Sequence, residues 1–368
     1  MAATDLMRRL ATVLGGLLGG LFATHAARAV DLPEDTAEAM VHSYTGGGVT
    51  ANGPALLVRK KLFDKVSVSG TYYVDSVSNA SIDVVTTASP YRETRHEYSF
   101  GADYVYRDSQ ITLGMNRSDE PDYTANRYSL DVTQETFGGM TTVLLGFTRG
   151  SDNVEKHNSP EFHDTATHWQ YRVGVTQILT PRWIASANFE AIADDGYLGS
   201  PYRSARVFGA FAPERNPRTR ESRALNFRVN GDLGSHDAVP ASYRYFWDTW
   251  AIKAHTLEAG YSRYFGDQWL ADATLRYYTQ THALFYSDNA QSETTYVSRN
   301  RQLSTFNDIG LGGKLTYTMG KVAGRFDVKL NGSYEYIRYK YSDFTDVRTG
   351  GLYGFNASVL QLYLTANF

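Results

Sequence analysis

The carboxyl-terminal segment alternates strictly between apolar and polar residues and ends on an aromatic side chain. In an extended strand, one face would carry Leu360, Leu362, Leu364, Ala366 and Phe368, and the other Gln361, Tyr363, Thr365 and Asn367. Alternation with a period of two predicts a β-strand that separates an apolar from a polar environment. The pattern predicts that the strand reaches the last residue, Phe368.

The same unit recurs along the chain, as an alternating segment followed by a turn or a polar loop. Clear examples are residues 66–75, 97–104, 225–232 and 326–336. Their polar rows carry small residues and charges of both signs, which is typical of the solvated lumen wall of a barrel. A soluble β-sandwich would also alternate. A last strand that ends on Phe, however, resembles the terminal strand of bacterial outer-membrane barrels, which the barrel-assembly machinery reads. We therefore assign Phe368 as the assembly signal.

The connections between these segments alternate in length, as they do in outer-membrane barrels. Short turns are predicted at residues 63–65, 108–109, 137–139, 180–182, 266–268 and 319–321. Long polar loops are predicted at 79–94, 118–124, 151–166, 194–221, 284–302 and 341–354, and one tight connection, near Asp248, falls on the long-loop side. Closure requires a first strand near residues 39–44. The sequence thus predicts an all-β, transmembrane antiparallel up-and-down β-barrel of about 16 strands, with 14 or 18 as alternatives.

The amino-terminal segment has the pattern of a cleavable Sec signal peptide. Arg8 and Arg9 precede a short Gly-rich apolar run, and Ala27-Arg28-Ala29 is a small-x-small cleavage site. The run is shorter than the ~20 apolar residues of a spanning helix. We predict a signal peptide over residues 1–29, cut after Ala29, a short periplasmic segment over 30–38, and the barrel over 39–368. The expected location is the outer membrane of a Gram-negative bacterium.

Composition agrees with this location and excludes several kinds of site. The chain has no Cys, so it offers neither disulfides nor thiolate metal ligands. Its 27 Tyr residues match the aromatic girdles of barrels. The formal charge of −3 becomes about −5 once the three Arg and one Asp of residues 1–29 are removed, so nucleic acid is not an expected partner.

Several runs resemble an uncharacterised family of bacterial outer-membrane proteins, the "domain of unknown function 3570" family. The resemblance covers nearly the whole chain after residue 29. It is carried by residues 44–48, 53–61, 74–91, 122–126, 201–204, 243–245 and 276–280. It implies an outer-membrane location and no particular activity, so a function has to be argued from individual sites.

The longest predicted loop, residues 194–221, is basic and also carries apolar side chains such as Phe208 and Phe211. A long loop with apolar residues of its own usually packs against another part of the protein. The loop would either fold into the lumen as a constriction or lie over the mouth as a lid. In a constriction its arginines would favour anions weakly. The candidate residues are Arg203, Arg206, Arg215, Arg218 and Arg220.

A second candidate site is a polar patch on three consecutive predicted strands between residues 242 and 280. Neighbouring strands lie ~4.8 Å apart, so polar residues in phase on them can interact. The patch would either brace the barrel wall or bind and select solutes. Its members are Arg244, Asp248, Glu258, Arg276, Tyr278 and Gln280.

The other polar segments carry no specific catalytic or metal-binding motif. Residues 75–95, 118–124 and 151–166 are rich in Asp, Glu, Ser and Asn, as expected of hydrogen-bonded or solvated loops. Acidic outer loops of barrels also commonly meet divalent cations that bridge lipopolysaccharide. His255 is in phase with apolar residues, and no Gly-x-Ser-x-Gly motif occurs. We expect no metal, no cofactor and no enzymatic activity.

Two functional hypotheses remain. The first is a pore for small polar solutes with weak anion preference, because barrels of 16–18 strands leave an aqueous channel. The second is a structural or interaction component of an envelope assembly, with a lumen plugged by loops or by an envelope protein partner. Bulky predicted lumen residues such as Tyr73 and Phe246 favour the second. In both, outer-membrane lipid, lipopolysaccharide and the barrel-assembly machinery are the other expected partners.

Overall fold

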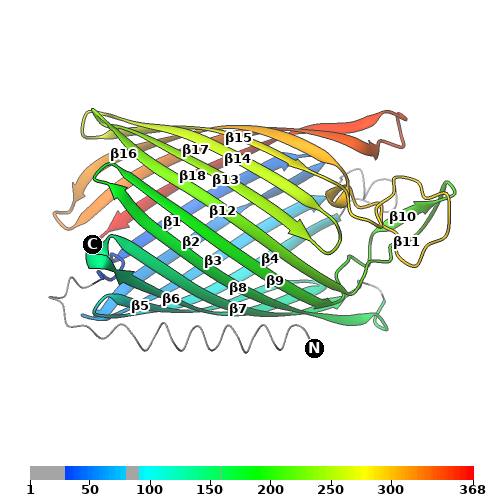
Figure 1. Ribbon diagram of the computed structural model, residues 1–368, viewed down its shortest axis with the longest axis horizontal. Coiled ribbons are helices and arrows are strands. Elements are labelled where there is room, and N and C mark those ends of the chain that lie inside the picture. Colours follow the sequence, from blue (N-terminus) through cyan, green and yellow to red (C-terminus); the bar gives the residue numbers. More distant parts are fainter. Residues whose placement is uncertain (1–29, 80–90, 158) are drawn as a thin grey trace.

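The protein is a closed antiparallel β-barrel. A computed structural model describes residues 30–79, 91–157 and 159–368, in which sixteen strands form one closed sheet (Figure 1). Each of these strands pairs with its neighbours in chain order, and β1 closes the sheet against β18. The predicted architecture and strand number are confirmed.

The elements are listed here with their bounds. The barrel strands are β1 (Thr36–Gly46), β2 (Val49–Phe63), β3 (Val66–Asn79), β4 (Tyr91–Tyr106), β5 (Ser109–Glu120), β6 (Tyr123–Thr136), β7 (Thr141–Glu155), β8 (His163–Thr180), β9 (Trp183–Gly196), β12 (Thr219–Gly234), β13 (Asp237–Asp248), β14 (Lys253–Phe265), β15 (Trp269–Gln280), β16 (Phe306–Val322), β17 (Phe326–Thr345) and β18 (Leu352–Asn367). Outside the barrel sheet are strands β10 (Ser204–Val207) and β11 (Ala210–Pro213) and the short 3₁₀ helices η1 (Phe137–Gly139) and η2 (Arg301–Leu303).

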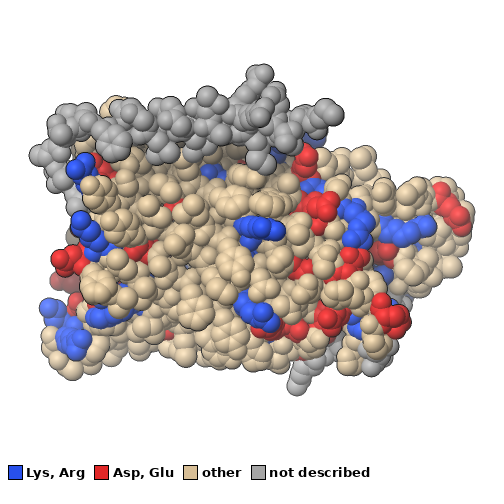
Figure 2. All heavy atoms as spheres, turned by 90° about the horizontal axis from the view of Figure 1, so that it is seen from below, with Lys and Arg blue, Asp and Glu red and all other residues tan. Residues whose placement is uncertain are grey.

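The alternation in sequence becomes an alternation between the outer surface and the lumen. On β18, Leu360, Leu362 and Leu364 are 41–48% exposed on the outer face. Gln361, between them, accepts a hydrogen bond from Ser333 of β17 at 3.2 Å on the lumen face. Figure 2 shows one side of the barrel, where charged side chains gather toward the ends and other residues cover a wide band between them. An apolar outer band around a polar lumen is the arrangement of a transmembrane barrel.

Two of the predicted connections between strands prove wrong. Residues 319–321 do not form a turn: a bulge between Thr318 and Gly320 interrupts β16, and the turn follows at 323–325. Gly320 has a positive φ of 79°, which explains why its sequence reads as a turn. Residues 118–124 are not a long loop, because β5 and β6 extend until only Pro121 and Asp122 connect them.

The first strand begins three residues earlier than predicted, at Thr36. Part of the predicted segment 30–38 therefore belongs to the barrel wall. The residues before it remain attached: the Lys60 ammonium pairs with Asp35 at 2.5 Å, and the Phe368 N–H donates to the Asp35 carbonyl at 3.1 Å. The predicted signal peptide, residues 1–29, lies outside the described residues. Within the described ranges, no helix is long and apolar enough to cross a membrane.

The longest connections form a lobe at the end of the barrel opposite the chain's carboxyl terminus. Hairpin β10–β11 projects beyond the barrel there (Figure 1). Val207 of the hairpin bridges to Ala290 of the β15–β16 connection, residues 281–305, and Arg215, just after the hairpin, bridges to Val297. Because outer-membrane barrels have short periplasmic turns and longer extracellular loops, we call this end the outer mouth.

A candidate solute site at the barrel mouth

The connection between β13 and β14 is a tight turn among the long loops of the outer mouth, as its sequence suggested. The Ala251 N–H donates to the Asp248 carbonyl at 3.2 Å, and the Ile252 N–H donates to the Asp248 carboxylate at 2.8 Å. Ala251 has a φ of 67°, a conformation that non-glycine residues rarely adopt. Trp250 and Ile252, at 5% and 4% exposure, are buried against Ala283 and Leu303 of the connection 281–305.

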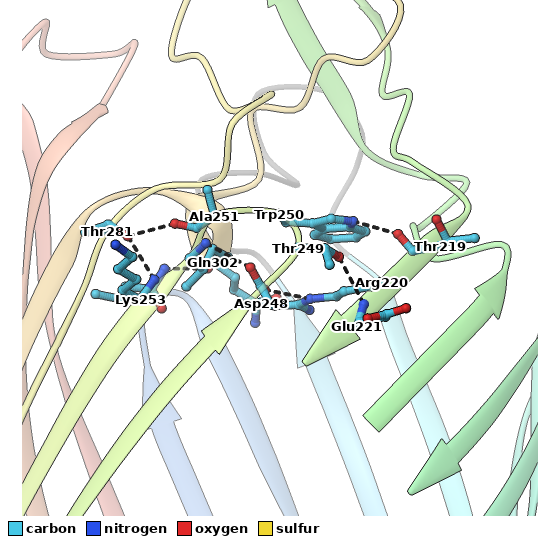
Figure 3. Close-up of polar contacts among 12 residues, drawn as sticks. Thr219, Arg220, Glu221, Asp248, Thr249, Trp250, Ala251, Lys253, Thr281 and Gln302 are labelled. Carbon is cyan, nitrogen blue, oxygen red and sulfur yellow. Dashed lines mark hydrogen bonds and ion pairs between the residues drawn. The ribbon is translucent and has the colours of Figure 1, made fainter. Parts of the chain in front are cut away.

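Arg220 of β12 holds this turn against the neighbouring strand (Figure 3). Its guanidinium pairs with the fully buried Asp248 carboxylate at 2.5 Å and lies 4.6 Å from the centre of the Trp250 ring system. The Trp250 indole N–H donates to the Thr219 carbonyl at 3.0 Å. A buried charge-assisted pair with a stacked aromatic ring is a rigid arrangement, so the turn forms a fixed part of the mouth.

The connection 281–305 lies against this turn and reaches the lumen wall. The Leu284 N–H donates to the Trp250 carbonyl at 2.8 Å. From β15, the Gln280 amide donates to the carbonyls of Gln302 at 3.0 Å and Ser304 at 2.8 Å. Gln280 therefore fixes the η2 region of this connection to the inner side of the barrel mouth.

A cavity of about 550 Å³, which we call the mouth cavity, lies beneath these loops. Its basic lining residues are Arg203, Arg220 and Arg244, and its acidic ones are Asp194 and Glu214. Five strands and the two long connections contribute to it, so segments far apart in sequence meet there. The remaining lining residues are His168, Leu198, Gly199, Ser200, Asn216, Phe246, Trp250, Ile252, Tyr278, Gln280, Asn300, Gln302 and Leu303.

The acidic side of the cavity is held by a hydrogen-bonded network. His168 of β8 lies between two carboxylates, with Nδ1 2.7 Å from Asp194 and Nε2 2.8 Å from Asp152. The Tyr123 hydroxyl also donates to Asp152. These acidic groups already have partners within the barrel wall, and this limits their ability to bind a solute.

Comparison with known proteins identifies the family. The profile of the family described as Protein of unknown function (DUF3570) matches residues 35–352. The chain belongs to this family. The resemblance seen in the sequence is thus confirmed. No significant match was found among curated proteins.

Solved structures similar to this DUF3570 protein are outer-membrane barrels. A bacterial polysaccharide outer membrane secretin aligns with 10% identity and a TM-score of 0.52, over 92% of this chain and 100% of that chain. The siderophore receptor PirA from Pseudomonas aeruginosa aligns with 11% identity and a TM-score of 0.45, over 86% of this chain but 60% of the receptor. The CymD monoaromatic hydrocarbon channel aligns with 11% identity and a TM-score of 0.44, over 92% and 89%. At these identities the likeness is one of fold alone.

The five arginines predicted for a constriction are not brought together in the DUF3570 protein. Arg203 and Arg220 line the mouth cavity. Arg218 pairs with Asp164 at 2.7 Å, while Arg206 and Arg215 belong to the projecting lobe and donate to the carbonyls of Gly209 at 3.4 Å and Thr294 at 2.8 Å. The lobe arginines therefore stabilise the loops where they lie, beyond the barrel end.

The predicted polar patch does lie on the lumen face, divided between two sites. Arg244, Tyr278 and Gln280 line the mouth cavity. Glu258 and Arg276 line a second hollow of about 440 Å³. Arg276 lies 3.8 Å from Glu258 and 3.0 Å from Asp308, a partner that the sequence pattern did not reveal. Asp248 pairs instead with Arg220, as described above.

The other segments considered in the sequence have structural partners. His255 faces outward, and its Nδ1 lies 2.7 Å from the Tyr243 hydroxyl. Asp122 accepts a hydrogen bond from the Tyr202 hydroxyl, and burial together with this bond raises the pKa of Tyr202 to about 12. Among the described residues, no group of three or more His, Cys, Asp or Glu is placed to bind a metal ion. Residues 80–90 of the polar segment 75–95 lie outside the described residues.

Proposed function

We propose that the protein is an outer-membrane pore for small polar solutes with a weak preference for anions. The observation that carries this proposal is the polar lumen of a sixteen-stranded barrel, a size that leaves an aqueous channel in other barrels. The described residues form no separate plug domain; they belong to the barrel strands, to the connections between them and to hairpin β10–β11. The likeness to channel and receptor barrels is compatible with this function.

The anion preference rests on arginines that form no direct ion pair. In the described part of the chain, neither Arg203 nor Arg244 forms an ion pair, and both line the mouth cavity. Arg228, which lines the second hollow, also lacks an ion pair with any described residue. Rings or clusters of Arg favour anions in pores, and a narrow low-dielectric site strengthens their field.

The test is conductance of the refolded protein in planar bilayers. Single-channel steps are expected, and reversal potentials in a salt gradient should show a modest anion preference. The double variant Arg203→Ser/Arg244→Ser should shift selectivity toward cations, whereas the control Arg206→Ser in the projecting lobe should not. A cation-selective wild type would contradict the anion preference, and the absence of conductance would contradict the pore.

The alternative is a structural or interaction component of the envelope with a plugged lumen. It is favoured by the connection 281–305, which reaches the lumen face through Gln280 and packs Tyr286 against an aromatic cluster around Tyr341 and Phe344. Silence in bilayers, together with recovery of an envelope protein after crosslinking in cells, would favour this function over the pore. Neither proposal includes a catalytic step.

A further inference from the structure

The arginines that line the mouth cavity differ in whether a carboxylate pairs with them. Arg220 is neutralised by Asp248, and Asp194 is shared with His168. Glu214 accepts hydrogen bonds from the Ser298 hydroxyl at 3.0 Å and from the Arg299 N–H at 2.9 Å. The two other guanidiniums, those of Arg203 and Arg244, have no carboxylate partner within the described residues.

The same cavity has an apolar side next to Arg244. The Arg244 guanidinium lies 5.4 Å from the centre of the half-buried Phe246 ring, which leaves its hydrogen-bond donors available to a ligand. Leu198, Leu303 and Tyr278 also line the cavity. A volume of about 550 Å³ is within the usual range for a small-molecule site, in which apolar side chains surround a few polar groups.

We infer that the mouth cavity binds small monocarboxylates that carry a compact apolar or aromatic body. The Arg244 guanidinium holds the carboxylate, since its planar fork of donors matches two carboxylate oxygens. Arg203 adds positive potential, and Phe246 contacts the apolar body. Inorganic anions would leave this apolar side uncovered, and neutral aromatics would leave Arg244 unpaired. This inference rests on the proposed pore function, for which the cavity would be the entry site.

Binding can be measured by isothermal titration calorimetry on the refolded full-length protein, independently of conductance. Three probes separate the contributions: benzoate has both the charge and the ring, acetate lacks the ring, and benzyl alcohol lacks the charge. Benzoate is expected to bind at least ~10-fold more tightly than either of the others, because charge-assisted hydrogen bonds and ring burial both contribute. Equal affinity for acetate and benzoate, or no benzoate binding, would overturn the inference.

Two variants and a matched control locate the site. Arg244→Gln should weaken benzoate binding about 10-fold or more, and Phe246→Ser should weaken benzoate but not acetate. Arg228→Gln removes a lumen arginine that also lacks an ion pair with any described residue but lies outside the mouth cavity, and it should leave benzoate affinity unchanged. Heat-modifiable migration on gels verifies that each variant is folded. Unchanged binding by Arg244→Gln, or equal losses in both arginine variants, would overturn the assignment.

Bilayer recordings distinguish failure of this site from failure of the pore. If the protein conducts, benzoate in the millimolar range should interrupt the wild-type current and interrupt that of Arg244→Gln less. If the protein binds benzoate but does not conduct, the site stands and the pore function fails. If the protein conducts, but benzoate neither interrupts the current nor gives a binding signal in calorimetry, the pore stands and the carboxylate site fails.

Discussion

Replacing Trp250 with alanine is expected to release the connection 281–305 from the barrel mouth while leaving the barrel closed. The Trp250 side chain is 5% exposed, contacts the Phe285 ring edge-on at 4.9 Å, and donates a hydrogen bond to Thr219. Removing a buried Trp side chain costs about 3–5 kcal/mol. Since 1.4 kcal/mol corresponds to a factor of ten, the released state should become roughly 100- to 4,000-fold more populated.

Trypsin provides the assay, because Arg299 and Arg301 lie within this connection. Arg299 is 3% exposed and pairs with Asp288 at 2.8 Å, so cleavage after it requires the connection to open. In Trp250→Ala, cleavage near Arg299 should accelerate strongly, while heat-modifiable migration stays normal because the strand ladder is intact. Trp247→Ala, on the outward face of β13, is the matched control and should not change the cleavage rate. Cleavage of Trp250→Ala at the wild-type rate would refute the assigned role of Trp250.

Three further predictions concern the barrel itself. Leu362→Arg should lower the free energy of unfolding by ~2–4 kcal/mol, because the side chain of residue 362 faces lipid. Gln361→Arg should be tolerated, because residue 361 faces the lumen. Equal losses of stability in the two variants would contradict the assigned faces. Gly146→Ala should lower the free energy of unfolding by up to ~1 kcal/mol, because its Cβ would lie 2.3 Å from the Asp131 carboxylate oxygen and would displace it from Arg172. Gly70→Ala, with nothing within 4 Å of its Cβ, should be neutral in the same titration. Deleting Phe368 should reduce the assembled barrel in outer-membrane fractions, and normal levels would count against its role as the assembly signal.

The barrel could be predicted because its main determinants are local. Period-two alternation sets which residues face lipid, and the requirement for closure implied the additional strand near residues 39–44. Strand ends were less predictable, because a strand can continue where its sequence has become polar. The polar residues 118–124 read as a loop, but β5 and β6 continue until only Pro121 and Asp122 connect them. At Gly320 the sequence predicted a turn, but the structure has a bulge within β16. A glycine with positive φ occurs in a bulge as readily as in a turn.

The candidate site was only partly predictable, because it depends on contacts between distant segments. Arg244, Tyr278 and Gln280 follow from strand phase alone. Their meeting with residues 300–303 depends on how a long connection folds back, and no local pattern specifies this. One signal was available: apolar residues such as Trp250 in a tight turn among long polar loops suggest that the turn packs inward.

Several ion pairs of the lumen wall depend on strand register, which the sequence does not reveal. Arg172 of β8 reaches Asp131 of β6 at 2.8 Å across the intervening β7. The pair passes over Gly146, where a Cβ would lie 2.3 Å from Asp131 and 2.9 Å from Arg172. A glycine at this position thus permits an ion pair that spans three strands. Only the register places these three residues side by side.

Local neutralisation of the wall explains how a few arginines can set selectivity in a chain with net negative charge. The paired groups include Arg59 with Asp103, Arg95 with Asp75, Arg172 with Asp131 and Arg276 with Asp308. The field of such a pair falls off faster with distance than that of a single charge, and charges on the outer loops are screened within ~8 Å at physiological salt. A solute in the mouth cavity therefore experiences chiefly the nearest groups that form no ion pair, which include Arg203 and Arg244. Ion preference should follow Arg203 and Arg244 more closely than the net charge of the protein.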